Sequence, residues 1–253
     1  MNIDEATDEQ LALWQRGKTH PHCPVMCHHQ IGEYDDRGFT VVTTAIDAER
    51  LVVLREVVDG FRATDHKSWL WATPDDAKHG YYYDVVGRSM ELLGLCIDPF
   101  ISDLVEPLIE KPISLYCATH VRKPATASDN TVPFHQDFPV VAPRHRPQVY
   151  LALDDCDIRN GCVRMVPGSH KLGPLPHRKS RLPHFSWEVD RDCSDAVPIA
   201  LRAGQAIVFH PLVIHGSFHA VSAKPRRVVI FTYQGGPDTA AANGAPSIIV
   251  RTG

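Results

Sequence analysis

Asn160-Gly161-Cys162-Val163-Arg164-Met165-Val166-Pro167-Gly168 is a short β-rich run enclosed by two turn-forming dipeptides. Asn-Gly and Pro-Gly are strong turn signals, and the apolar and β-branched residues between them predict a strand. The same pattern continues on both sides, and Lys123-Pro124 and Ala203-Gly204 supply further turns. The other predicted strands are Ile113–Val121, Val149–Leu153, Ala206–Phe209 and Val228–Tyr233. Many short strands separated by turns predict a sandwich or a barrel.

Helical patterns precede this β-rich part. Asp47 is a suitable N-cap for a helix that runs to about Val58. We expect further helices at Asp4–Lys18, Val85–Cys96 and Pro99–Ile109, and a strand at Gly38–Thr44. The chain is therefore expected to be a single domain over residues 1–253, with a helix-rich part at about 1–112, a β core at about 113–234 and a C-terminal tail at 235–253.

The composition excludes several classes of protein. Of the 253 residues, 43% are hydrophobic and 22% are charged, which is typical of a globular protein. The net charge of −4 argues against nucleic-acid binding, and no apolar run approaches the roughly 20 residues of a membrane span. Met1 to Gln10 are polar and acidic, unlike a signal peptide, so we expect a cytoplasmic protein.

The seven cysteines form no regular framework, which predicts reduced thiols. One segment, residues 20–29, is rich in cysteine and histidine and could bind zinc. No second Cys/His pair follows at the spacing of a zinc finger, so we interpret this segment as a linker. Its Cys and His residues are His20, His22, Cys23, Cys27, His28 and His29.

Candidate ligands for a metal occur at two places in the β-rich part. In Pro133-Phe134-His135-Gln136-Asp137-Phe138, residues two apart on a strand face the same side, so His135 and Asp137 would project together. His215 ends the apolar run Leu212-Val213-Ile214, where a partly buried imidazole requires a partner. His210 and His219 compete for that role, but neither has an equally clear position at the end of a strand.

Two histidines and one carboxylate form the facial triad of non-haem Fe(II) oxygenases. Zinc more often has tetrahedral geometry, and the three residues alone do not distinguish these metals. A further pair, Arg226-Arg227, opens the strand Val228–Tyr233, and only one of two adjacent residues can face inward. The inward arginine needs an anionic partner, either the carboxylate of a ligand or a structural acid.

These segments together resemble the phytanoyl-CoA dioxygenase family of Fe(II)/2-oxoglutarate-dependent oxygenases. The resemblance covers about Phe39 to Tyr233, and Asn160–His170 is its most specific piece. The other matching segments are Phe134–Asp137, Leu151–Asp155, Ala203–Ala206, His215–Ser217 and Arg226-Arg227. One departure is Ala220, where members of the family often have asparagine.

The resemblance implies a mainly β fold with flanking helices around a double-stranded β-helix (jelly-roll, cupin-like) core. It implies that His135, Asp137 and His215 bind Fe(II), that Arg226 anchors 2-oxoglutarate, and that His170 is structural. It further implies oxidation of a C–H bond with O₂, by hydroxylation, with release of succinate and CO₂. The intact Asp137 argues against a halogenase, in which a small residue replaces this carboxylate.

The alternatives are a 2-oxoglutarate-independent, cupin-like isomerase or hydrolase, and a non-catalytic metal-binding protein on the same fold. For an oxygenase we expect a small-molecule substrate, with no nucleic-acid or membrane partner. Residues 170–197 show no clear periodicity and suggest a lid or binding loop. The basic residues at its start could bind an anionic substrate, or they form an ordinary solvated face. Tyr81–Tyr83 and Trp69–Trp71 could line an aromatic or polycyclic substrate, such as a natural-product intermediate, or they serve the packing of helices and loops. The basic residues are Lys171, Arg178, Lys179 and Arg181.

Overall fold

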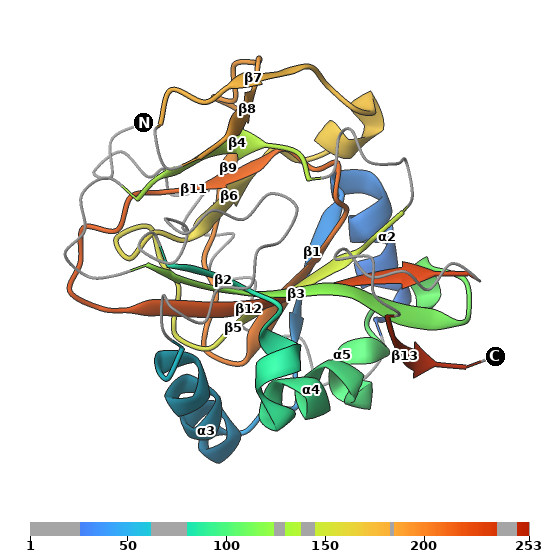
Figure 1. Cartoon of the computed structure of the whole chain (residues 1–253). Coiled ribbons are helices and arrows are strands. Elements are labelled where there is room, and N and C mark those ends of the chain that lie inside the picture. The colour runs from blue at the N-terminus through green and yellow to red at the C-terminus, as the bar shows by residue number, and fades with distance from the viewer. Residues whose placement is uncertain are drawn as a thin grey trace.

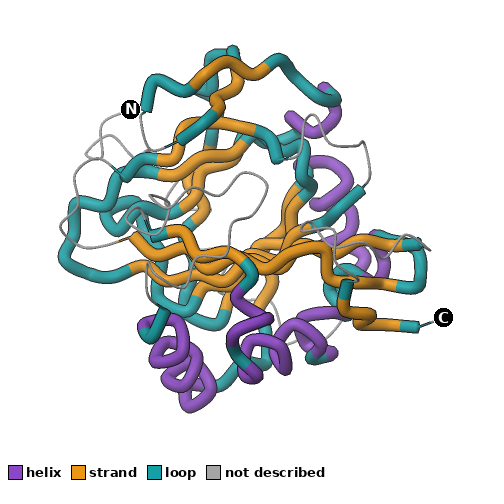
Figure 2. The backbone as a smooth tube through the Cα atoms, in the orientation of Figure 1, coloured by secondary structure: helices purple, strands orange, loops and turns teal. Residues whose placement is uncertain are grey.

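Two antiparallel sheets face each other in the computed structural model, with helices outside the larger sheet (Figures 1 and 2). The structure describes residues 26–61, 80–123, 130–137, 145–182, 185–236 and 247–252. The expected helix at Asp4–Lys18 and the aromatic segment Trp69–Trp71 lie outside these residues. The jelly-roll arrangement confirms the predicted mainly β fold.

The larger sheet has the strand order β1-β10-β5-β12-β3-β13, and β2 also pairs with β3. All of its pairs are antiparallel. Its strands are β1 (Phe39–Thr43), β2 (Tyr81–Tyr83), β3 (Ile113–Lys123), β5 (Gln148–Ala152), β10 (Gln205–Phe209), β12 (Arg226–Gly235) and β13 (Ile248–Arg251). The predicted strands are thus present, and residues expected to form a plain C-terminal tail add β13 to the sheet.

The smaller sheet lies opposite and has the order β4-β11-β6-β9. It consists of β4 (Val132–His135), β11 (His215–Ser217), β6 (Val163–Met165) and β9 (Val197–Ile199). The segment that follows β6 forms the 3₁₀ helix η6 (Ser169–Leu172) and then a hairpin of β7 (His177–Lys179) and β8 (Trp187–Val189). This hairpin lies above the smaller sheet in Figure 1.

Alternation along the strands of the larger sheet separates two apolar layers. Val229, Phe231 and Tyr233 of β12 pack toward the helices, together with Leu151 of β5. Their neighbours Val228, Ile230 and Tyr150 face the space between the two sheets. The interior therefore has one wall from each sheet, and side chains that point inward can meet there.

The helices cover the outer face of the larger sheet (Figure 1). Asp47 accepts a hydrogen bond from the Arg50 amide, as expected for an N-cap, and Leu54 and Val58 are buried. Helix α2 begins directly after Cys27, so the predicted linker character of residues 20–29 is wrong for His28 and His29. The helices are α2 (His28–Arg37), α3 (Ala48–Asp59), α4 (Met90–Ile97) and α5 (Pro99–Ser102).

Two predicted helices are shorter than expected. The helix expected over Val85–Cys96 is divided into η4 (Val85–Arg88) and α4, because extended Ser89 caps α4 by accepting a bond from the Leu92 amide. The helix expected over Pro99–Ile109 stops at Ser102 and resumes as the 3₁₀ turn η5 (Glu106–Leu108). Pro107 has no amide hydrogen to donate, which opposes a continuous helix there.

None of the helices in the described ranges has the length and apolar character that crossing a bilayer requires. The described cysteines are free thiols, as the sequence predicts. They are Cys27, Cys96, Cys117, Cys156, Cys162 and Cys193.

Candidate metal centre

His135, Asp137 and His215 converge between the two sheets, and one ligand atom from each lies within 4.8 Å of the others. The Nε2 atom of His135 is 3.4 Å from Oδ1 of Asp137, and Nε2 of His215 is 3.7 Å from Oδ2. His135 and His215 are also direct partners in the pairing of β4 with β11. The pairing of these strands therefore brings together residues that are 80 positions apart.

Backbone hydrogen bonds orient both imidazoles. Nδ1 of His135 lies 2.9 Å from the Pro133 carbonyl, and Nδ1 of His215 lies 3.0 Å from the Val213 carbonyl. A carbonyl can only accept, so each Nδ1 carries a proton, and each Nε2 is the ring nitrogen that faces Asp137. Partners of this kind fix the tautomer and the ring direction of metal-binding histidines.

Asp137 lies just beyond the end of β4, so the expectation that it shares a strand with His135 is not met. Its amide instead donates to the Pro211 carbonyl, 2.8 Å away, in the segment that leads to His215. Its Oδ2 accepts a short hydrogen bond from the Gln148 amide. Burial alone would raise the pKa of Asp137, but His215, His135 and Gln148 hold it below its ordinary value. Asp137 is therefore an anion at neutral pH.

Burial lowers the pKa of His215 to about 4, and the neighbouring His135 contributes to the decrease. A neutral imidazole is the form that binds a metal. The centre thus combines one anionic oxygen with two imidazole nitrogens. This set suits a divalent first-row ion and leaves other coordination positions free for ligands.

Arg226 lies in the same cavity and is only 2% exposed. Its Nη1 donates a short hydrogen bond to the Tyr150 hydroxyl, whereas its buried Nε has no hydrogen-bond partner among the described residues. The buried Ser217 hydroxyl, two residues after His215, faces the same cavity and likewise has no partner in that part of the chain. Unpaired buried polar atoms are costly, so these two groups indicate a place for a ligand with negatively charged oxygens.

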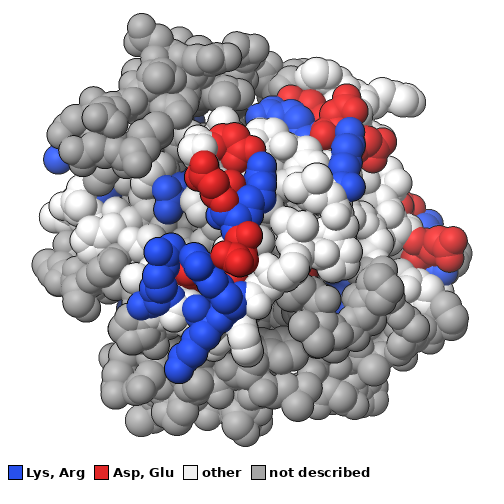
Figure 3. Space-filling model, turned by 90° about the horizontal axis from the view of Figure 1, so that it is seen from above, with Lys and Arg blue, Asp and Glu red and all other residues white. Residues whose placement is uncertain are grey.

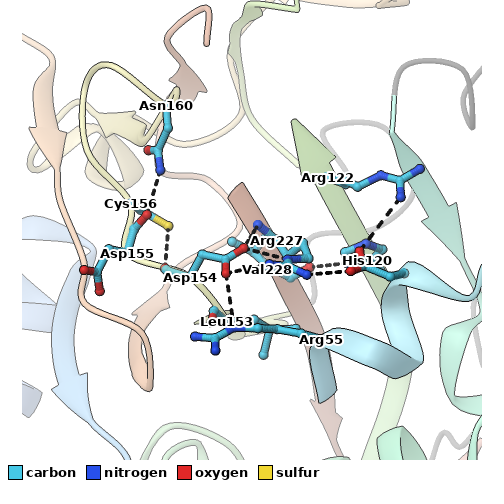
Figure 4. A network of polar contacts seen from close by, with 11 residues as sticks. Arg55, His120, Arg122, Leu153, Asp154, Asp155, Cys156, Asn160, Arg227 and Val228 are labelled. Atoms are coloured by element: carbon cyan, nitrogen blue, oxygen red, sulfur yellow. Dashed lines mark hydrogen bonds and ion pairs between the residues drawn. The ribbon is translucent and has the colours of Figure 1, made fainter. Parts of the chain in front are cut away.

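Arg227 points to the other face of β12. It forms ion pairs with Asp154 and Asp59, so it is not turned to open solvent. Figure 4 shows Asp154 between Arg227 and Arg55, whose Nε is 3.1 Å from Asp154 Oδ1. The adjacent arginines thus have different partners, as their strand positions predict.

The cavity has a volume of about 650 Å³ and contains the triad, Arg226 and Tyr150. Tyr81 and Tyr83 of β2 line it, and residues of the β7–β8 hairpin line its opposite side. The Phe185 ring lies with its centroid 4.7 Å from that of His135. The segment predicted to be a lid or binding loop therefore contributes directly to the site.

The competing histidines lie elsewhere. His210 packs against His145 and His170, and Nδ1 of His219 lies 3.1 Å from the Asn130 side-chain oxygen. His170 lies 3.1 Å from the Asp35 carbonyl, in agreement with a structural role. The triad is the only such group of His, Cys, Asp and Glu side chains within the described ranges.

Sequence reasoning missed Gln148, Tyr150 and Ser217. The first two lie two apart on β5, and Ser217 lies two after His215 on β11, so each shares a face with a neighbour in the cavity. Alternation from His215 could have identified Ser217. No signal in the sequence places β5 beside β12, and the roles of Gln148 and Tyr150 depend on that pairing.

Fold and centre together define a jelly-roll protein with a candidate 2-His-1-carboxylate metal site. The sequence model of the phytanoyl-CoA dioxygenase (PhyH) family matches residues 34–228. The chain belongs to the phytanoyl-CoA dioxygenase family.

Known proteins extend this comparison. Phytanoyl-CoA dioxygenase 1 of Oryza sativa subsp. japonica is 31% identical over 255 residues, covering 83% of this chain and 89% of the relative. The peroxisomal phytanoyl-CoA dioxygenase of Rattus norvegicus is 32% identical over 143 residues, covering 51% of this chain and only 42% of its own length. The chain thus spans less than half of the rat protein.

A similar solved structure is that of the epimerase SnoN in complex with Fe³⁺, α-ketoglutarate and nogalamycin RO. Its TM-score is 0.67 at 20% identity, with 86% of this chain and 94% of that chain covered. At this identity, the likeness concerns the fold.

Proposed function

We propose that this protein is an Fe(II)/2-oxoglutarate-dependent dioxygenase that hydroxylates a C–H bond of a small molecule. In this proposal His135, Asp137 and His215 bind the iron and Arg226 binds 2-oxoglutarate. The observation that carries it is a metal-binding triad and an incompletely paired buried arginine in one cavity. The helices and the β core would act as one domain, since helices pack on the sheet whose inner face lines the site.

The donor set fits iron. Two neutral imidazoles and one carboxylate leave three positions of an octahedron open, enough for a bidentate cosubstrate and O₂. The bound iron would supply the activation of O₂, with 2-oxoglutarate as the source of two electrons and succinate and CO₂ as coproducts. The protein itself supplies the position and the surroundings of these groups.

Arg226 fits the distal carboxylate of 2-oxoglutarate. A planar guanidinium binds a carboxylate through two parallel N–H groups, and the buried Nε of Arg226 has no partner in the described ranges. The Ser217 hydroxyl can donate a further hydrogen bond to the same carboxylate. Burial raises the pKa of Tyr150, so its phenol stays protonated and Arg226 keeps a neutral partner. An acid in place of Tyr150 would neutralise the arginine.

Phe185, Leu175 and Pro176 cover the cavity on the side of the hairpin. These apolar side chains exclude water from the ligand atoms of His135 and His215, which strengthens electrostatic interactions there. A substrate that enters between the hairpin and Tyr81 would lie beside the metal centre. Its reacting C–H bond would then be held close to the centre without being a ligand.

The rival assignment is a metal-dependent isomerase or hydrolase that uses no 2-oxoglutarate. The partly unpaired Arg226 argues against it, because such an enzyme gives this group no obvious partner. A non-catalytic metal-binding protein would equally leave the cavity and its apolar cover without a purpose.

The test is the formation of succinate from 2-oxoglutarate by purified protein with Fe(II), ascorbate and O₂. We expect turnover in the wild type and none in Asp137→Ala, because the loss of a ligand weakens the metal site. Undiminished turnover by Asp137→Ala in metal-defined buffer would remove Asp137 from the ligand set. Tight binding of metal without binding of 2-oxoglutarate, measured by calorimetry with redox-stable Mn(II), would favour the isomerase or hydrolase.

A further inference from the structure

The cavity walls that the described residues form carry little charge beyond the groups already assigned. Among the described lining residues outside the histidines, Asp137 and Arg226 are the acid and the base, and the proposed metal and cosubstrate engage both. Burial lowers the pKa of the lining His177. Its Nδ1 donates to the Leu175 carbonyl, and its Nε2 accepts from the backbone amide of Gln136. The ring is therefore neutral, and both of its nitrogens have hydrogen-bond partners. A charged substrate would find no free counter-ion on these walls.

The remaining walls are largely apolar and aromatic. Both sheets contribute aliphatic side chains, and β2 and the hairpin add rings. The residues concerned are Val121, Val163, Met165, Ile230, Tyr81 and Trp187. A cavity of about 650 Å³ lies within the range of about 300–1,000 Å³ that is typical of sites for drug-sized ligands. It can therefore hold a substrate beside 2-oxoglutarate.

Trp187 is 58% exposed although it lines this cavity. A large ring that is left half-open beside an apolar wall gains stability when a ligand covers it. Phe185, two residues earlier, already lies against His135. The two rings thus extend from the metal centre toward the outside and form one edge of a path for the substrate.

The basic residues around the hairpin are mostly engaged by acids. Arg178 lies 2.9 Å from Glu188 and 3.3 Å from Asp190, Arg181 lies 3.1 Å from Glu188, and Lys171 lies 3.3 Å from Asp36. Figure 3 shows acidic side chains beside basic ones on this face, together with a contiguous group of basic side chains. A ligand carrying several phosphates would have to compete with these acids for Arg178, Arg181 and Lys171, which weakens the hairpin as a site for a polyanionic carrier.

We propose that the substrate is an uncharged, largely hydrocarbon or aromatic molecule, bound free and covered by Trp187, not as a thioester of a phosphate-bearing carrier such as coenzyme A. This inference rests on the proposed function for the location of the metal and of 2-oxoglutarate. It is supported by the apolar side chains of the cavity walls and by the ion pairs that the basic residues of the hairpin form.

The experiment compares two fluorescent tricyclic probes that differ in charge, 9-anthracenemethanol and anthracene-9-carboxylate. Binding is followed by fluorescence anisotropy, with Mn(II) and saturating 2-oxoglutarate present so that Arg226 is already occupied. We expect the neutral probe to bind about tenfold more tightly or better, because a carboxylate would be desolvated without a partner. Trp187→Ala should weaken binding of the neutral probe roughly fivefold or more, since it removes an aromatic contact. The matched control Met90→Ala, at an exposed site on α4, should leave it unchanged.

Calorimetry of Mn(II) and 2-oxoglutarate, run in parallel without a probe, tests the proposed function separately. Anthracene-9-carboxylate binding as tightly as the neutral probe, or displacement of the neutral probe by coenzyme A, would overturn the substrate class. The same conclusion follows if neither probe binds while metal and 2-oxoglutarate do. If 2-oxoglutarate does not bind, Arg226 remains a free cation in the cavity. The oxygenase assignment then fails, and the substrate class that rests on it fails with it.

Discussion

Arg227 and Asp154 form a bidentate ion pair, with Nε to Oδ2 at 2.7 Å and Nη2 to Oδ1 at 3.0 Å. The amide of Arg227 donates to the same Oδ2 at 2.9 Å. This contact fixes the start of β12 on its outer face, so the preceding Arg226 points into the cavity. A slip of one residue would exchange the two side chains.

Arg226→Ala should raise the 2-oxoglutarate requirement about tenfold or more, because a charged hydrogen-bonded pair is lost. Arg226→Lys should recover only part of this, since an ammonium lacks the planar fork. Arg227→Ala should leave the requirement nearly unchanged and lower the free energy of unfolding by about 2 kcal/mol, because Asp154 loses the nearer of its two arginine partners. Titrations with 2-oxoglutarate and urea unfolding measure the two effects. If Arg227→Ala is the variant that impairs 2-oxoglutarate binding, the roles are reversed.

Gln148→Leu should weaken metal binding roughly 10–100-fold, the usual effect of removing a partner that orients a ligand. The Gln148 amide holds Oδ2 of Asp137, and leucine has similar size without a donor. Calorimetric titration with Mn(II) measures the change. The control is Thr232→Val, which removes a 3.4 Å hydrogen bond to the Gln148 oxygen but leaves the bond from Gln148 to Asp137, and it should have a smaller effect. Equal affinities in Gln148→Leu and the wild type would show that Asp137 needs no such support.

Gln136→Leu should loosen the segment before the hairpin. The side-chain NH₂ group of Gln136 donates to the backbone carbonyls of Gly173 and Leu212, at 3.0 and 2.8 Å. Its side-chain oxygen accepts from the backbone amide of Leu175 at 2.8 Å. We expect faster hydrogen exchange at residues 173–177 and a loss of roughly 1–3 kcal/mol in stability. Gln205→Leu, which removes a buried amide on β10, should leave exchange in this segment unchanged. Unaltered exchange in Gln136→Leu would show that other contacts hold the segment.

Acid should destabilise the protein partly through His120, which is fully buried. Burial lowers its pKa from 6.5 to about 3. Because the folded-state pKa is depressed, the unfolded chain binds the proton first, and stability falls as the pH decreases from 6.5 toward 3. At pH 5.5 this histidine should cost about 1.4 kcal/mol relative to pH 7.5.

His120→Phe should remove that share of the pH dependence, whatever its effect on absolute stability. Urea unfolding at pH 7.5 and 5.5 gives the difference for each protein. His29→Phe, on the exposed side of α2, is the control and should keep the wild-type difference. If the free energy of unfolding changes by the same amount between pH 7.5 and pH 5.5 in the wild type and in His120→Phe, His120 is already protonated in the folded state at pH 5.5.

The sequence by itself predicted the strands β1, β3, β5, β6, β10 and β12 to within a few residues, because short apolar runs between Gly and Pro turns have few alternatives. Alternation on a strand also predicted that Arg226 and Arg227 would face opposite ways. Helix lengths were less determined, since Ser89 and Pro107 interrupt patterns whose apolar periodicity continues through them. His135, Asp137, His215 and Arg226 were identified as candidates from their spacing and from the family resemblance.

Only the tertiary structure decided which side chains complete the site. Tyr150 reaches Arg226 because β5 lies beside β12, and Gln148 of β5 reaches Asp137, which follows β4 of the other sheet. Both contacts depend on residues far apart in the sequence. The basic residues after His170 suggested an anionic substrate, yet the hairpin pairs Arg178 and Arg181 with Glu188. Local patterns specify what a segment can form, whereas the charge that remains free depends on which side chains the fold places side by side.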